Sequence, residues 1–176
     1  EISCILILAQ QLNNIINTNS NFDNKAIEPQ TIATIFWSVA KLDNNIIDTN
    51  MLMTLLSFFQ VNQCDIQNIA ILLWSLARLD KIPNNTKDIV QSIIIYLHQQ
   101  IEQYKHEMII TIRHLSMIIW SLGKLKYQET SITNFLTSMS QFIIVEIKEN
   151  HQLWSWTPRD VTDIIWGYSE MQMYDS

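Results

Sequence analysis

The sequence predicts an all-α fold, an α-solenoid of stacked helical hairpin repeats of about 37 to 46 residues. Four similar segments are each centred on a tryptophan, at Trp37, Trp74, Trp120 and Trp166, and successive tryptophans are 37, 46 and 46 residues apart. Between these segments lie further stretches with apolar residues at helical spacing. Such a period is typical of solenoids, in which each unit buries its apolar face only against its neighbours.

The repeat pattern divides the chain into five parts. We expect residues 1–24 to form the second helix of a preceding repeat, followed by three repeats and one further motif helix: 27–62, 64–106, 109–150 and 157–176. Natural arrays close with polar caps, whereas both ends here carry repeat-like apolar residues. We therefore expect the chain to be a fragment of a longer array.

Each tryptophan segment is predicted to be an amphipathic helix, here called a motif helix. With the tryptophan as position 0 and 100° per residue, positions −5, −2, −1, +2 and +5 fall on one arc and are apolar. In the first three segments these positions hold Ile32, Ile35, Phe36, Val39, Leu42; Ile69, Leu72, Leu73, Leu76, Leu79; and Leu115, Ile118, Ile119, Leu122, Leu125. This arc is the expected core face.

A neighbouring arc, positions −4 and +3, carries only small residues. They are Ala33, Ala40, Ala70, Ala77, Ser116, Gly123, Thr162 and Ser169. Because the distance between packed helices depends on side-chain size at the contact, another helix is expected to approach closely there.

Sequence signals also locate the helix starts and the second helices. Pro29 and Pro158 lie just inside two motif helices, with Glu28 and Thr157 as candidate caps. The second helices are expected over roughly 49–60, 86–104 and 131–148, where apolar residues recur at spacings of three and four.

Composition excludes several classes of function. With two glycines, the sequence has no Gly-rich phosphate loop. It also has no run of about 18 apolar residues, the length that would indicate a membrane span. Cys4 and Cys64 lack metal-ligand spacing and are expected to be small buried hydrophobes, and the four histidines are scattered. We therefore predict a non-enzymatic protein with no catalytic residues, metal, cofactor or small-molecule substrate.

The third arc of the motif helices, positions −7, −6, −3, +1 and +4, is mostly polar and is the better candidate for function. Position +4 holds Lys41, Arg78 and Lys124, and position −7 holds Gln30, Gln67, Arg113 and Arg159. Aligned in parallel copies, these side chains could contact phosphates and base edges, or they could form a plain solvated face. The net charge of −6 argues against a strongly basic surface, but the acidic residues concentrate outside this arc.

The repeated tryptophans also allow two interpretations. They could stack bases, as aromatic side chains do in proteins that bind single strands. A tryptophan at a fixed solenoid position is, however, normally an interface residue, so we expect these side chains to pack between hairpins.

The motif segments resemble a known repeat family. Residues 29–42, PQTIATIFWSVAKL, and residues 67–79, QNIAILLWSLARL, resemble the octotricopeptide repeat and related heptatricopeptide repeats of organellar proteins, some of which end in a RAP domain. The fourth segment departs from the pattern at Asp160, Asp163, Gly167 and Glu170. Its contact with phosphate is therefore the least supported.

The resemblance implies an organellar protein, mitochondrial or else of a chloroplast or other plastid, that binds a transcript or ribosomal RNA. On the polar arc, the residues expected to contact RNA are Gln30, Thr31, Thr34, Lys41, Gln67, Asn68, Arg78, Arg113, His114, Lys124 and Arg159. The alternative is a protein-binding scaffold, or a structural subunit of an organellar ribosome or other large assembly. That alternative would be favoured by exposed apolar residues among Tyr96, Leu97, Tyr104, Phe142 and Ile143 on the second helices.

Overall fold

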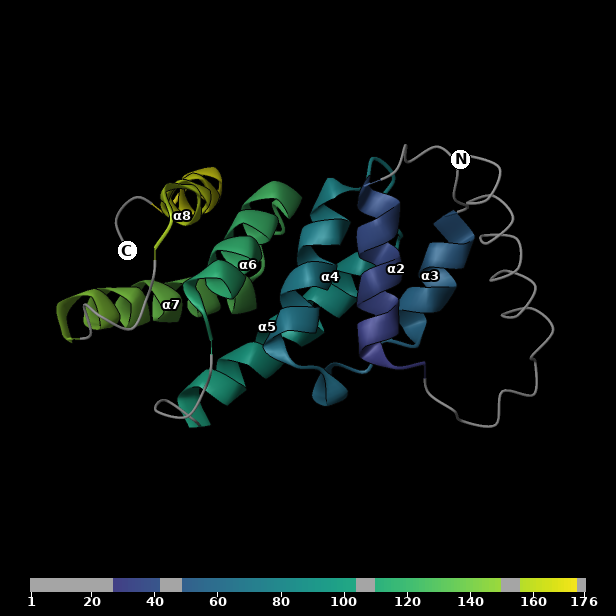
Figure 1. Cartoon of the computed structure of the whole chain (residues 1–176), viewed down its shortest axis with the longest axis horizontal. Coiled ribbons are helices and arrows are strands. Elements are labelled where there is room, and N and C mark those ends of the chain that lie inside the picture. The colour runs from purple at the N-terminus through teal and green to yellow at the C-terminus, as the bar shows by residue number, and fades with distance from the viewer. Residues whose placement is uncertain (1–26, 42–48, 104–109, 150–155, 174–176) are drawn as a thin grey trace.

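The computed structural model describes residues 27–41, 49–103, 110–149 and 156–173, and within them every regular element is helical (Figure 1). The α-helices are α2 (Pro29–Lys41), α3 (Thr49–Ser57), α4 (Ile66–Arg78), α5 (Thr86–Gln103), α6 (Ile112–Leu125), α7 (Thr130–Glu149) and α8 (Pro158–Glu170), with a 3₁₀ turn, η1, at Val61–Gln63. The all-α prediction is therefore confirmed for this part of the chain. The helix expected within residues 1–24 lies outside the described residues.

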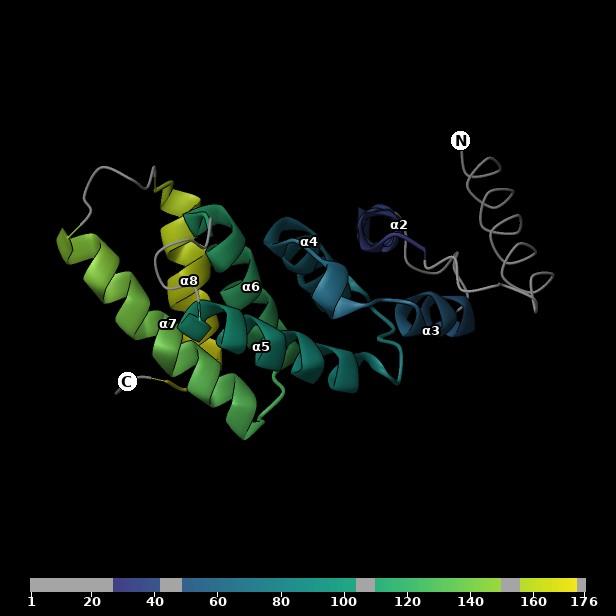
Figure 2. The ribbon, with the colours of Figure 1, turned by 90° about the horizontal axis from the view of Figure 1, so that it is seen from below.

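The helices form two layers. The motif helices α2, α4, α6 and α8 pack side by side in chain order, and α3, α5 and α7 lie together on one side of them (Figure 2). Successive motif helices are also rotated, since α2 stands upright in Figure 1 whereas α8 is seen nearly end-on. The motif helices, which second-layer helices separate in the sequence, thus lie side by side on one face of the molecule.

The core lies between the two layers and uses the arc predicted for the motif helices. All five predicted core positions of α4 and its C-cap, and of α6, are buried, as are Ile32, Phe36 and Val39 of α2. Apolar residues of the other layer complete this core, among them Leu55, Leu56, Ile93, Leu97, Phe135 and Met139. Ile35 is half-buried and Leu42 lies outside the described residues.

The fourth motif helix differs because part of its apolar arc is open. Ile164 is buried, but Val161 and Ile165, at the core positions −5 and −1, are exposed, Ile165 by 64%. In the first three units these positions are covered. Within the described residues, α8 is the one motif helix not followed by a helix of the second layer, which explains the exposure.

Side-chain caps fix where three of the motif helices begin. The carboxylate of Asp65 accepts from the Asn68 N–H at 2.7 Å, and the Thr111 hydroxyl accepts from the His114 N–H at 3.3 Å. Thr157 and Asp160 form a capping box at the start of α8, as the predicted cap at Thr157 requires. At the start of α2, the carbonyl oxygen of Glu28 accepts from the N–H groups of Thr31 and Ile32.

The small residues lie where neighbouring motif helices meet. Ala33, Ala40, Ala70, Ala77, Ser116 and Gly123 are buried, as expected, whereas Thr162 and Ser169 of α8 are exposed. The closest approach is between α6 and α8. A Cβ atom built on Gly123 would lie 2.7 Å from the Cα of Gly167, and one built on Gly167 would lie 2.5 Å from the carbonyl oxygen of Ile119.

One position assigned to the polar arc is instead part of this contact. Ser75, Ser121 and Gly167, at position +1, are buried, and only Ser38 of α2 is exposed. The two buried hydroxyls donate to carbonyl oxygens one turn earlier, those of Ile71 at 2.7 Å and Met117 at 2.6 Å. Periodicity alone placed this position in solvent because it does not show on which side the preceding unit packs.

Polar contacts also join α8 to the second layer and helices within that layer to each other. The Tyr168 hydroxyl of α8 donates to the Leu136 carbonyl oxygen of α7 at 2.9 Å, and His98 of α5 lies 3.1 Å from the Ser138 hydroxyl of α7. Cys64 is buried, as predicted. Its burial, and to a smaller extent the charge of Asp65, raise the pKa of its thiol to about 12. Cys4 lies outside the described residues.

Candidate nucleic-acid interface

The motif helices expose one stripe of side chains on the side away from the core. Each residue advances about 100° around a helix, so positions −7, −3, 0 and +4 fall within about 60° of one another on a helical wheel. These positions, here called the motif stripe, are all exposed or half-buried in α2, α4, α6 and α8. The tryptophan therefore shares one surface with the predicted polar residues.

On α2 and α4 the tryptophans of the motif stripe are partnered by cations. The Lys41 Nζ lies 5.5 Å from the ring centroid of Trp37 and 5.5 Å from that of Trp74 on the next motif helix. The Arg78 guanidinium lies 4.9 Å from the ring centroid of Trp74. These are cation–π distances, so the predicted +4 cations are held over aromatic rings while remaining exposed.

The tryptophans of the last two units contact each other. The ring centroids of Trp120 and Trp166 are 5.8 Å apart, with their planes tilted by 31°. This pair packs between units, as the sequence predicted. Trp37 does not follow that expectation, because 44% of its side chain is exposed.

The fourth unit replaces the basic end of the stripe with an acidic one. Glu170 occupies position +4 of α8 and forms an ion pair with Lys126, while Asp163 at position −3 lies 3.5 Å from Arg159. By contrast, positions −7, −3, 0 and +4 of the first three units carry no carboxylate. Lys124, at position +4 of α6, is exposed and has no ion-pair partner among the residues the structure describes.

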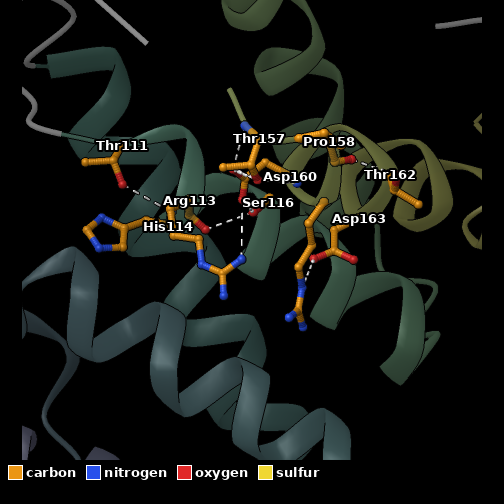
Figure 3. Close-up of polar contacts among 10 residues, drawn as sticks. Thr111, Arg113, His114, Ser116, Thr157, Pro158, Asp160, Thr162 and Asp163 are labelled. Atoms are coloured by element: carbon orange, nitrogen blue, oxygen red, sulfur yellow. Dashed lines mark hydrogen bonds and ion pairs between the residues drawn. The ribbon is translucent and has the colours of Figure 1, made fainter. Parts of the chain in front are cut away.

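Arg113 is drawn into a polar cluster between α6 and α8 (Figure 3). Its guanidinium lies 3.4 Å from the Oδ1 of Asp160, a carboxylate that is only 2% exposed. The same oxygen accepts from the Ser116 hydroxyl at 3.0 Å, and Oδ2 accepts from the Thr157 hydroxyl at 2.6 Å and from the Thr157 N–H at 3.2 Å. Part of the predicted RNA-binding charge of Arg113 is therefore neutralised within the protein.

Burial and hydrogen bonding act in opposite directions on Asp160. Burial raises the pKa of its carboxyl group, but hydrogen bonds from Thr157, Ser116 and Arg113 outweigh that effect and hold the pKa below its usual value. The pattern of a threonine followed three residues later by an aspartate is a sequence signal for a capping box, and it could have predicted this role.

His114 lies beside the cluster, and its ring points away from Asp160 (Figure 3). The side chain is half-buried, and Nδ1 is buried without a hydrogen-bond partner. Burial lowers the pKa of the imidazole, and the charge of Arg113 lowers it further, whereas the charge of Asp65 acts in the opposite direction. Near neutral pH His114 therefore carries little charge, and a contact with a base would be that of a neutral ring.

The remaining predicted site residues are divided between the stripe and the contacts beside it. Gln30, Thr31, Thr34 and Gln67 are exposed, and Asn68 is half-buried, with its backbone N–H used in the cap of α4. The Thr34 hydroxyl donates to the Gln30 carbonyl oxygen at 2.8 Å, so its oxygen keeps acceptor capacity. The structure thus brings Gln30, Thr34, Lys41, Gln67 and Arg78 onto one face.

The apolar residues named for a protein-binding surface are mostly covered. Leu97 and Ile143 are buried, Tyr96 and Phe142 are half-buried, and Tyr104 lies outside the described residues. Different apolar side chains are exposed on that layer, namely Ile95 on α5 and Ile144, Val145 and Ile147 on α7.

Comparison with known proteins gives no relative, since no family model, curated protein or solved structure matches the chain. Within the described ranges, no helix is long and apolar enough to span a membrane. Among the residues that the structure describes, no group of three or more His, Cys, Asp or Glu side chains could hold a metal ion.

Proposed function

We propose that this chain is part of an α-solenoid that binds RNA without catalysing a reaction, along the motif stripe of α2, α4 and α6. The observation that carries the proposal is the recurrence of an exposed cation at the same register position, Lys41, Arg78 and Lys124, on three adjacent helices. Because these helices pack side by side in chain order, the three cations lie along one surface, where they can contact phosphates of a single strand.

The distribution of charge supports the same face. Although the net charge is −6, the stripe on these three helices carries four cations, two amides and one hydroxyl beside its tryptophans, Ile71 and Met117, and no carboxylate. Segregated charge of this kind attracts a polyanion even when the whole protein is acidic. The likeness to octotricopeptide repeats supports a mitochondrial or plastid transcript or ribosomal RNA as the partner.

A charge-reversal variant tests the proposal. Changing Lys41, Arg78 and Lys124 together to Glu is expected to weaken binding of single-stranded RNA and to reduce the slope of log affinity against log salt by about 2, since each phosphate contact on a single strand contributes about 0.7. Fluorescence anisotropy with a labelled oligoribonucleotide, at several salt concentrations, measures both quantities.

The matched control reverses charge in the other layer. Lys87→Glu, Gln99→Glu, Asn134→Glu and Lys148→Glu together change the net charge by the same amount, and all four side chains are exposed on α5 or α7. We expect this variant to retain most of the affinity and slope. Equal losses in the two variants would mean that net charge, and not the motif stripe, governs binding.

A second candidate function is a protein-binding subunit of a large assembly. It is favoured by Ile144, Val145 and Ile147, three apolar side chains that are each about half exposed near the end of α7. A photo-crosslinking residue placed at Ile147 is expected to capture a specific protein in the native complex, whereas one placed at exposed Gln99 of α5 is not. Capture of RNA at Lys124 without protein at Ile147 would favour the first function.

A further inference from the structure

Trp37 is the tryptophan of the motif stripe whose side chain is most available to a ligand. It is 44% exposed, whereas Trp74, Trp120 and Trp166 are half-buried. Among the described residues, α2 is the motif helix with no preceding motif helix against it, and this leaves Trp37 open together with Ser38. Trp37 shares the exposed stripe of α2 with Gln30, Thr34 and Lys41, and the Lys41 ammonium lies 5.5 Å from its ring centroid.

The cations Lys41 and Arg78, which lie over the Trp37 and Trp74 rings, come from two different motif helices. Lys41 belongs to α2, yet its Nζ is equally distant from the Trp37 and Trp74 rings, at 5.5 Å from each centroid. Arg78 of α4 lies over Trp74, at 4.9 Å from the centroid. Two positive groups and an exposed indole are thereby held at one place on the surface, between the first and second motif helices.

We propose that Trp37, Lys41, Trp74 and Arg78 form a site for one unpaired nucleotide, with its base stacked on the exposed part of the Trp37 indole that Lys41 does not cover and its phosphate held by Lys41 and Arg78. This inference rests on the proposed function and adds the class of ligand, single-stranded RNA. A base within a duplex has its faces covered by its neighbours, whereas an unpaired base can leave the strand and stack on an aromatic side chain.

Polar groups beside the indole give the base an edge to contact. The Gln30 amide can both donate and accept, and the Thr34 oxygen, whose hydrogen is used on the Gln30 carbonyl, can accept. Gln30 and Thr34 lie about two turns and one turn before Trp37 on the same stripe. Stacking therefore supplies affinity at this site, and these two side chains are positioned to select the base.

The opposite end of the stripe cannot form the same site. The Trp120 and Trp166 rings contact each other, and the cation of position +4 is replaced by Glu170, which is paired with Lys126. Asp163 adds a second carboxylate to the stripe of α8. Bound RNA is therefore expected to run over α2, α4 and α6 and to leave the surface before α8.

The test compares Trp37→Leu with Trp37→Phe. For a single-stranded oligoribonucleotide, Trp37→Leu is expected to weaken binding about 10-fold and Trp37→Phe much less, because phenylalanine keeps an aromatic face. An abasic oligomer with the same phosphates is expected to bind the wild type and Trp37→Leu equally. Ile95→Ala, at a site on α5 that is 43% exposed, is the matched control and should leave binding unchanged.

Fluorescence gives a second readout that does not depend on affinity. Saturating RNA is expected to quench the wild-type tryptophan emission more than that of Trp37→Phe, since stacking on a base quenches an indole. Equal quenching, with equal affinity of wild type and Trp37→Leu for the oligoribonucleotide, would overturn the stacking site. If the Lys41, Arg78 and Lys124 reversal still abolished binding in that case, the proposed function would stand without it. A wild type that binds no RNA would overturn both.

Discussion

Replacing Gly167 with alanine is expected to lower the free energy of unfolding by about 2–3 kcal/mol, although alanine is the better helix former by about 1 kcal/mol. The new Cβ would lie 2.5 Å from the Ile119 carbonyl oxygen and 2.8 Å from its carbon. Those atoms are backbone and cannot rotate away, so α6 and α8 would have to separate. Urea unfolding followed by circular dichroism measures the loss.

Two further variants show whether this loss arises at the helix contact. Gly123→Ala is expected to be similarly destabilising, because its Cβ would lie 2.7 Å from the Gly167 Cα. The double variant should lose less than the sum, since both changes push apart the same pair of helices. Thr162→Ala, on the exposed side of α8, should change stability by less than about 0.5 kcal/mol. A Gly167→Ala protein as stable as the wild type would show that the helices separate freely.

Replacing Asp160 with alanine is expected to cost about 2–3 kcal/mol. The change removes the carboxylate half of the capping box of α8, which accepts from the Thr157 N–H and hydroxyl, and with it the acceptor of the Ser116 hydroxyl and the Arg113 guanidinium. Asp160→Asn should cost less, because one carbonyl oxygen remains. The matched control is Asp163→Asn, which breaks the more exposed pair with Arg159 and should cost under about 1 kcal/mol.

The same carboxylate gives stability a dependence on pH. Because its folded pKa lies below the value of about 3.9 expected in the unfolded chain, it stabilises the protein fully above that value. The contribution is lost as pH falls through the folded pKa. Denaturation midpoints measured from pH 6 to pH 2 should therefore decline less steeply for Asp160→Asn than for the wild type. Parallel curves would mean that Asp160 is not the ionised acceptor of the cluster.

The helices and most of the core could be predicted because apolar periodicity is a local property of the sequence. Ile69, Leu76, Leu115 and Leu122 are buried at the positions where a helix of period 3.6 places them. The sequence of one helix does not show which other helix packs against it. Ile165 has the same register as buried Ile119 and is exposed because a second-layer helix covers α6 and none is described over α8.

The candidate site was predictable in composition and less so in geometry. The +4 cations are exposed as expected, but the placement of Lys41 over the ring of Trp74 depends on the distance between units, which the sequence of one repeat does not contain. Trp37 and Trp120 share a position, yet only Trp120 has a tryptophan of the following unit against it. Likewise, Asp160 differs from its counterparts because Ser116 of the preceding unit offers it a hydrogen bond.

Because Lys41 contacts indole rings on two helices, its position depends on the distance between α2 and α4. Its ammonium is attached to one helix but is also attracted by an indole of the next, and the attraction weakens steeply beyond about 6 Å from a ring centroid. Tension that spreads the units would remove one aromatic partner and displace the charge, whereas compression would bring it nearer to both rings. The proposed affinity of this surface for an anion would therefore depend on how closely α2 and α4 pack.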